Sequence, residues 1–151
     1  MRCAVGAYIY KSSYILEIKN FKKIGGINMK NMEVKGFGKP DEVRKFEKGK
    51  VELVKIGGAM VGKATFQPGW KWSKHVKPLV KTESCEAPHF QYHLSGILHV
   101  VMDDGTEEDI KAGEISSLPT GHDAWVVGNE PVIVVDFQGM VDYARQSIKK
   151  K

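Results

Sequence analysis

Hydrophobic and polar residues alternate along several short stretches of the chain, and turn-forming residues separate these stretches. The alternation is clearest at 89–94 (HFQYHL), where His89, Gln91 and His93 fall on one face of an extended backbone. A period of two residues is typical of a β-strand. The stretches that we interpret as strands are 51–56, 59–66, 70–76, 89–94, 97–102, 114–118, 124–127 and 131–137. Many short strands in series predict an all-β fold.

Turn signals between these stretches support the same prediction. Gly57-Gly58 separates the first two stretches, and the sequence 103–106 (DDGT) predicts a tight hairpin turn. Helical potential is confined to 40–48 and 139–150, so we expect short helical segments only near the ends. No repeat or linker divides the chain after residue 28, and we expect one domain over 29–151 with its barrel at about 51–137.

Composition narrows the class of protein further. The chain has 151 residues, of which 42% are hydrophobic and 27% charged, as in a single domain with a substantial core. No apolar run approaches the roughly 18 residues of a membrane-spanning helix, so we expect no membrane partner. Cys3 and Cys85 are too few for a disulfide framework, and we expect a reducing, cytoplasmic location.

The first 28 residues carry most of the net charge of +5. They hold five basic residues and one acid, which leaves 18 basic and 17 acidic residues in the remaining 123. A nucleic-acid-binding domain needs a basic face on the folded part, so we expect no nucleic-acid partner. Gly25-Gly26 precedes Met29 at the spacing of a translated ribosome-binding sequence. Two interpretations of 1–28 stay open, a leader ahead of a start at Met29 or Met32 and a flexible extension.

Glycines and histidines recur at fixed spacings in the second half of the chain. Gly69 is followed after five residues by His75, and His89 is followed after six residues by Gly96. Farther on, Gly113 is followed after five residues by the sequence 119–121 (PTG). Two glycine-bounded motifs in this order, inside an all-β chain, resemble the two signature motifs of the cupin superfamily.

The resemblance covers about 51–137 and implies a double-stranded β-helix, which is a jelly-roll barrel. It also implies an interior pocket where three histidines and one carboxylate hold a divalent metal. The sequence departs from this pattern. Lys77 stands at the position of the second histidine, His89 at that of the carboxylate, and Ala124 at that of the last histidine. Eleven residues, 78–88, replace a turn of three or four.

A metal site remains possible because side chains two residues apart on a strand share a face. His122 lies two residues before Ala124, so we expect it to point into the same pocket. The predicted metal ligands are therefore His75, His89 and His122, with iron, zinc or nickel as the ion. Lys77 opposes this prediction if it points inward, where it would repel a cation; it then suits an anionic ligand. The alternatives are a solvent-exposed lysine and a pocket without metal.

Further pocket residues follow from the same strand and from the inserted loop. Gln91 can orient bound water or ligand, and His93 is either a pocket residue or a hydrogen-bonded core residue. Cys85 is either a fourth ligand or a buried filler. Glu83 either restores the missing carboxylate or is solvated.

The sequence thus predicts a cupin-domain protein with a histidine-lined pocket that binds a divalent metal and a small polar or anionic molecule. Such a site suits a metal-dependent oxygenase or isomerase, although no residue stands out as a catalytic acid or base. The alternative is a non-catalytic cupin that binds or senses a small ligand without metal. The resemblance also implies a homodimer.

Overall fold

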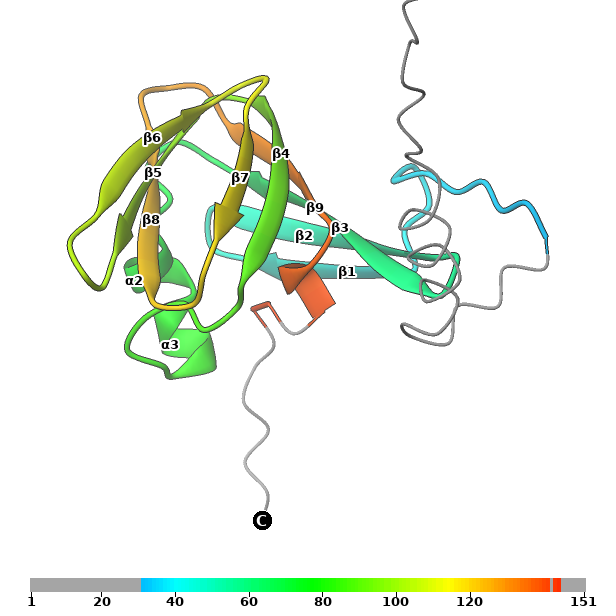
Figure 1. Ribbon diagram of the computed structural model, residues 1–151, viewed down its shortest axis with the longest axis horizontal. Coiled ribbons are helices and arrows are strands. Elements are labelled where there is room, and N and C mark those ends of the chain that lie inside the picture. The colour runs from blue at the N-terminus through cyan, green and yellow to red at the C-terminus, as the bar shows by residue number, and fades with distance from the viewer. Residues whose placement is uncertain (1–30, 142, 145–151) are drawn as a thin grey trace, which may run out of the picture.

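The computed structural model describes residues 31–141, 143 and 144, so the predicted leader or extension over 1–28 lies outside the described residues. Within this part the chain is built mainly of strands (Figure 1). In chain order the elements are β1 (Glu42–Phe46), β2 (Gly49–Ile56), β3 (Ala59–Phe66), α2 (Trp72–His75), α3 (Lys77–Val80), β4 (His89–Ser95), β5 (Ile97–Met102), β6 (Glu107–Lys111), β7 (Ile115–Leu118), β8 (His122–Val127), β9 (Val132–Asp136) and the 3-10 turn η1 (Gly139–Val141).

The strands form two antiparallel sheets. One has the order β1-β2-β3-β9-β4-β7 and the other has the order β6-β5-β8. Figure 1 shows the smaller sheet facing the β4 and β7 side of the larger one, while β2 and β3 extend away from this body. The crossovers that place β9 between β3 and β4 are those of a jelly roll, so the predicted all-β jelly-roll fold is confirmed.

Alternation along β4 sets the boundary between interior and surface. His89, Gln91 and His93 are buried, whereas the residues between them are exposed. β4 pairs with β7 on one side and with β9 on the other, so it is not an edge strand of the larger sheet. The interior of the jelly roll therefore receives polar side chains from a strand that is paired on both sides.

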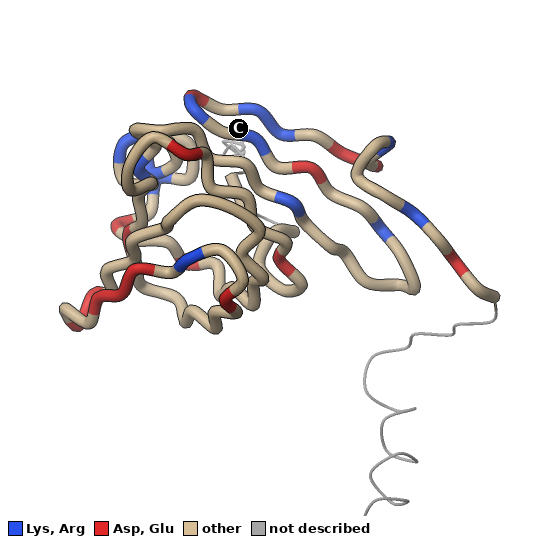
Figure 2. The backbone as a smooth tube through the Cα atoms, turned by 90° about the horizontal axis from the view of Figure 1, so that it is seen from above, with Lys and Arg blue, Asp and Glu red and all other residues tan. Residues whose placement is uncertain are grey.

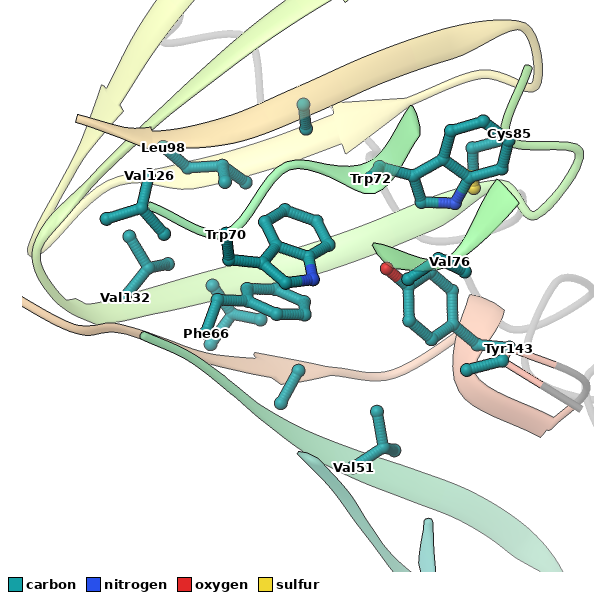
Figure 3. Packing of buried hydrophobic residues seen from close by; sticks show 14 of the residues in the cluster. Val51, Phe66, Trp70, Trp72, Val76, Cys85, Leu98, Val126, Val132 and Tyr143 are labelled. Atoms are coloured by element: carbon teal, nitrogen blue, oxygen red, sulfur yellow. The ribbon is translucent and has the colours of Figure 1, made fainter. Parts of the chain in front are cut away.

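Apolar side chains from both sheets fill the rest of the interior. Phe66 stacks on Trp70 with ring centroids 3.9 Å apart, and Val51 and Val132 of the larger sheet and Leu98 of the smaller sheet are buried (Figure 3). Burying a side chain of this size stabilises a fold by roughly 1.5–3 kcal/mol. The core thus fixes the sheets that carry the polar side chains.

Two segments differ from their sequence-based predictions. Residues 42–46 are strand β1 rather than part of a helix, because they pair antiparallel with β2 over their whole length. Residues 72–75 are helix α2 rather than strand, with backbone hydrogen bonds from His75 to Lys71 and from Val76 to Trp72. Short segments with few apolar residues are decided by such tertiary pairing rather than by local preference.

The acidic segment after the predicted hairpin turn is also more regular than expected. Residues 107–111 form β6, which pairs with β5, and Figure 2 shows the acidic residues of this hairpin as a run at one end of the molecule. Of the helix predicted over 139–150, the described residues form only the turn η1. None of the helices in the described part has the length and apolar character needed to cross a membrane.

Candidate metal centre

Three buried side chains from separate segments converge inside the jelly roll. Cys85, His89 and His122 each offer one ligand atom, and these three atoms all lie within 4.8 Å of one another. His89 begins β4 and His122 begins β8, so both stand at strand ends. Sulfur and imidazole nitrogen are ligands that zinc, iron, nickel and copper accept.

The long loop before β4 brings Cys85 into this group. Its backbone forms an isolated bridge with β8, in which the Cys85 amide donates to the His122 carbonyl at 2.8 Å. In return, the Gly121 amide donates to the Cys85 carbonyl at 2.7 Å. The loop therefore has a fixed register against β8, and the thiol is 3.6 Å from Nε2 of His89.

His89 is oriented by a buried carboxylate. Its Nδ1 lies 2.5 Å from Oδ2 of Asp136, which is fully buried at the end of β9. Burial opposes ionisation of Asp136, but its hydrogen bond and charge interaction with His89 hold the net pKa below the usual value. An ionised Asp136 can only accept, so Nδ1 carries the proton and Nε2 presents its lone pair to Cys85.

Asp136 is itself held by further donors. Its Oδ1 accepts from the backbone amides of Gln138 at 2.8 Å and Gly139 at 3.0 Å, and its Oδ2 also accepts from Nε2 of Gln91 at 3.1 Å. Carboxylates that orient ligand histidines in this way are common around protein-bound metals. Asp136 therefore fits the supporting role that a metal centre needs.

His122 carries its proton on the same ring nitrogen as His89, but a different acceptor holds that proton. Its Nδ1 donates to the Pro119 carbonyl at 2.8 Å, so Nε2 is left as the acceptor. Burial, followed by the charge of nearby His89, lowers the pKa of His122. The ring is consequently neutral at pH 7, as a metal ligand must be.

Cys85 is protonated in the absence of a metal. Burial, the largest cause, and the charges of Asp136 and Glu86 raise its pKa to about 11. Because only the thiolate is a strong ligand, a metal ion bound here would displace the proton.

The three ligand residues line a small interior cavity of about 20 Å³. This space suits one ion or one water molecule. Two buried polar atoms of residues that line the same cavity, Nε1 of Trp70 and Oε1 of Gln91, have no hydrogen-bond partner among the described residues. Such orphaned atoms are unfavourable unless something binds them, so the cavity fits a polar occupant.

Comparison with known proteins rests on structure alone, since no family model and no curated protein matches the chain. The S161A mutant of Bacillus subtilis oxalate decarboxylase is similar with a TM-score of 0.50 and 19% identity, over 68% of this chain and 29% of that chain. The chain has the cupin fold. It spans less than a third of the oxalate decarboxylase chain that it matches.

Smaller solved proteins are also similar to this chain. An RmlC-like cupin from Shewanella frigidimarina is 20% identical over 76% of this chain and 98% of its own, with a TM-score of 0.49. A cupin-like protein from Thermotoga maritima is 12% identical over 67% of this chain and 79% of its own, with a TM-score of 0.44.

The third predicted ligand lies outside the converging group. His75 belongs to α2, where its Nδ1 accepts from the Lys71 amide at 3.0 Å. Its Nε2 is 3.7 Å from Oε1 of Glu47, on the side of the helix away from Cys85. The helical backbone over 72–75 turns this ring out of the direction that the predicted strand would have given it. The structure thus joins His89 and His122 to Cys85 in place of His75.

Lys77 and Glu83 pair with each other at the surface of the protein. Nζ of Lys77 lies 2.8 Å from Oε2 of Glu83 and donates to the Glu83 backbone carbonyl at 3.0 Å. Hydrogen bonding with Lys77, then its positive charge, lowers the pKa of the Glu83 carboxyl. Neither side chain lines the cavity of the converging group.

His93 is buried but is separate from the candidate ligands. Its Nε2 is paired with the Ser116 hydroxyl at 2.9 Å, and burial lowers its pKa to about 4. Gln91 does line the cavity, and Nε2 of its side-chain amide donates to Asp136. Asp136 is not among the predicted site residues. Alternation along β9 places it on the same buried face as Val132 and Val134, which is the signal that could have indicated it.

Proposed function

We propose that this cupin binds one divalent transition-metal ion on Sγ of Cys85 and Nε2 of His89 and His122, and acts there on a small molecule. The convergence of these three buried ligand atoms within 4.8 Å carries the proposal. Both imidazoles hold their Nδ1 protons against fixed acceptors, so both Nε2 atoms present a lone pair that can bind a metal.

The donor set fits a borderline or soft ion. One thiolate and two neutral imidazoles suit zinc, ferrous iron or nickel, and two positive charges would offset the charge of a buried Cys85 thiolate. When bound, the ion supplies Lewis acidity to a donor atom of the small molecule. Asp136 orients His89 for this ion, while the Pro119 carbonyl orients His122.

A reactive site is favoured over a structural one. Structural zinc is normally closed by four protein ligands, whereas three protein ligands leave a position for another molecule. The described residues supply three here, and the orphaned atoms of Gln91 and Trp70 belong to side chains that line the same cavity. They can position the donor atom of a bound molecule, with Trp70 donating and Gln91 accepting.

Titration of the untagged, reduced protein with Co²⁺ tests the proposal. We expect one equivalent to bind with a thiolate-to-cobalt absorption in the near ultraviolet. Cys85→Ser should abolish that band, and His89→Ala or His122→Ala should weaken binding by on the order of a hundredfold or more. Circular dichroism of each variant separates ligand loss from unfolding.

His75→Gln is the matched control, because it alters a buried histidine of the same chain outside the converging group. It should keep both the stoichiometry and the thiolate band. Loss of binding in His75→Gln with retention in Cys85→Ser would favour the three-histidine set instead. If Co²⁺ does not bind to the folded wild-type protein, the alternative function is favoured, which is a non-catalytic cupin that binds a small ligand without metal.

A further inference from the structure

A larger pocket adjoins the candidate metal centre. It has a volume of about 390 Å³, and three of its lining residues, Trp72, Cys85 and Tyr143, also line the small inner cavity. Figure 3 shows the Tyr143 hydroxyl turned into the interior. These three side chains therefore form a wall with the ion's cavity on one side and the larger pocket on the other.

The walls of the larger pocket are mainly apolar. Trp72 and Tyr143 add aromatic surface, and valine, alanine and proline side chains supply six of the thirteen lining residues in the described part of the chain: Val76, Val80, Ala87, Pro88, Val141 and Ala144. The described residues that line it include no lysine, arginine or histidine, and its one charged residue, Glu86, is exposed. An anionic group in this pocket would find no cationic side chain among these described lining residues, and the pocket suits an apolar group instead.

The small inner cavity and the larger pocket differ in what they can hold. The cavity of about 20 Å³ beside the candidate ligands has room for the ion, whereas the space of about 390 Å³ beyond the wall is within the usual range for small-molecule pockets. The following inference rests on the proposed function. We propose that the small molecule has an apolar body, which the larger pocket holds, and one slim donor group that reaches the ion past Cys85.

This assignment changes the ligand chemistry expected from the sequence. A polar or anionic molecule was expected partly because Lys77 stood at a motif position, but Lys77 is paired with Glu83 and lines neither space. Apolar contact area, rather than ion pairing, is then the main source of affinity and selectivity for the body of the molecule.

A series of thiols with one donor group and different bodies tests the proposal on the Co²⁺-loaded protein under anaerobic conditions. The probes are ethanethiol, benzyl mercaptan and 3-mercaptopropionate. Their binding is monitored through the visible absorption spectrum of the bound cobalt. We expect benzyl mercaptan to bind at least tenfold more tightly than ethanethiol because its ring is buried. Equal affinities, or tightest binding of 3-mercaptopropionate, would overturn the proposal.

Val141→Asp probes the pocket without touching a candidate ligand, since Val141 lines the larger pocket and is 41% exposed. The substitution should weaken the binding of benzyl mercaptan about tenfold and leave the affinities for ethanethiol and Co²⁺ unchanged. Val43→Asp is the matched control, because Val43 has a similar exposure of 45% and lies on β1. An equal effect of both variants would contradict the assignment.

Saturation-transfer NMR with benzyl mercaptan on the metal-free protein separates this inference from the proposed function. Ring contacts that Val141→Asp removes and Val43→Asp keeps would support the pocket even where Co²⁺ fails to bind. A protein that binds Co²⁺ but shows no ring contacts would retain the proposed function and overturn the inference.

Discussion

At the scale of single residues, two histidines on one face of β4 behave differently because their neighbours differ. Nδ1 of His89 faces the ionised Asp136 and its Nε2 faces Cys85, so the ring is held in the form of a ligand. His93, four residues along, is fully buried and meets the Ser116 hydroxyl. Its Nδ1 has no hydrogen-bond partner among the described residues, so protonation there would place a charge on a buried, unpaired nitrogen.

The buried His93 gives a prediction about stability and pH. Burial lowers its pKa in the folded protein to about 4, with Glu114 acting weakly in the opposite direction, against about 6.5 in the unfolded chain. Below pH 6.5 the unfolded state takes up a proton that the folded state refuses, so His93 favours unfolding progressively between pH 6.5 and 4. The loss of stability reaches about 3 kcal/mol at the acid end.

Urea unfolding of wild type and His93→Gln measures this effect. The stability difference between the two proteins should be constant from pH 7 to 8 and should shift in favour of the variant as the pH falls to 4.5. A difference that does not change with pH would show that His93 is not the source.

At the scale of elements, the turn after β9 packs closely on the start of β4. A Cβ at Gly139 would clash with the Pro88 carbonyl oxygen and lie 2.6 Å from Nδ1 of His89. Because the Gly139 amide also donates to Asp136, the missing side chain lets η1 hold the carboxylate against the histidine ring. The geometry of the candidate centre thus depends on how two elements meet.

Gly139→Ala should therefore disturb both the fold and the metal affinity. We expect a loss of about 1–3 kcal/mol in stability from overpacking, and at least tenfold weaker Co²⁺ binding because His89 must move. Gly38→Ala is the matched control, since a Cβ at Gly38 meets nothing within 4 Å. Chemical denaturation and Co²⁺ titration of both variants check the prediction; unchanged affinity in Gly139→Ala would contradict it.

At the scale of the whole molecule, the outer face of the larger sheet is apolar over β4, β7 and the end of β9. Five of the exposed large apolar side chains lie over β4, β7 and the end of β9: Phe90, Tyr92, Leu94, Ile115 and Phe137. The rings of Phe90 and Phe137 are 6.4 Å apart. An apolar face of this kind is complementary to a copy of itself, so we expect the predicted homodimer to form across it.

Tyr92→Glu tests this prediction, because it places a charge at the middle of that face. We expect wild type to sediment as a dimer and Tyr92→Glu as a folded monomer in analytical ultracentrifugation. Val43→Glu, on β1, should leave the sedimentation unchanged. A wild-type monomer, or a dimer that tolerates Tyr92→Glu, would show that this face does not pair two copies.

Much of the fold was predictable from the sequence, for a local reason. The alternation over 89–94 and the turns at 57–58 and 103–106 act within a few residues, so they predicted β2 to β5 and the inward face of β4. β1 and α2 were not predicted, because pairing with β2 and packing beneath β8 overrode weak local preferences. His75 was assigned to the metal site on the expectation of a strand that is a helix in the structure.

The sequence by itself therefore determined the all-β jelly roll and the inward histidines His89 and His122, because motif spacing and alternation are properties of the chain. Only the tertiary structure decided their companions. The loop over 78–88 has no periodicity to show where Cys85 points, and its bridge to β8 places the thiol beside both rings. Asp136 lies 47 residues from His89 along the chain, and only the pairing of β9 with β4 brings the carboxylate to the ring.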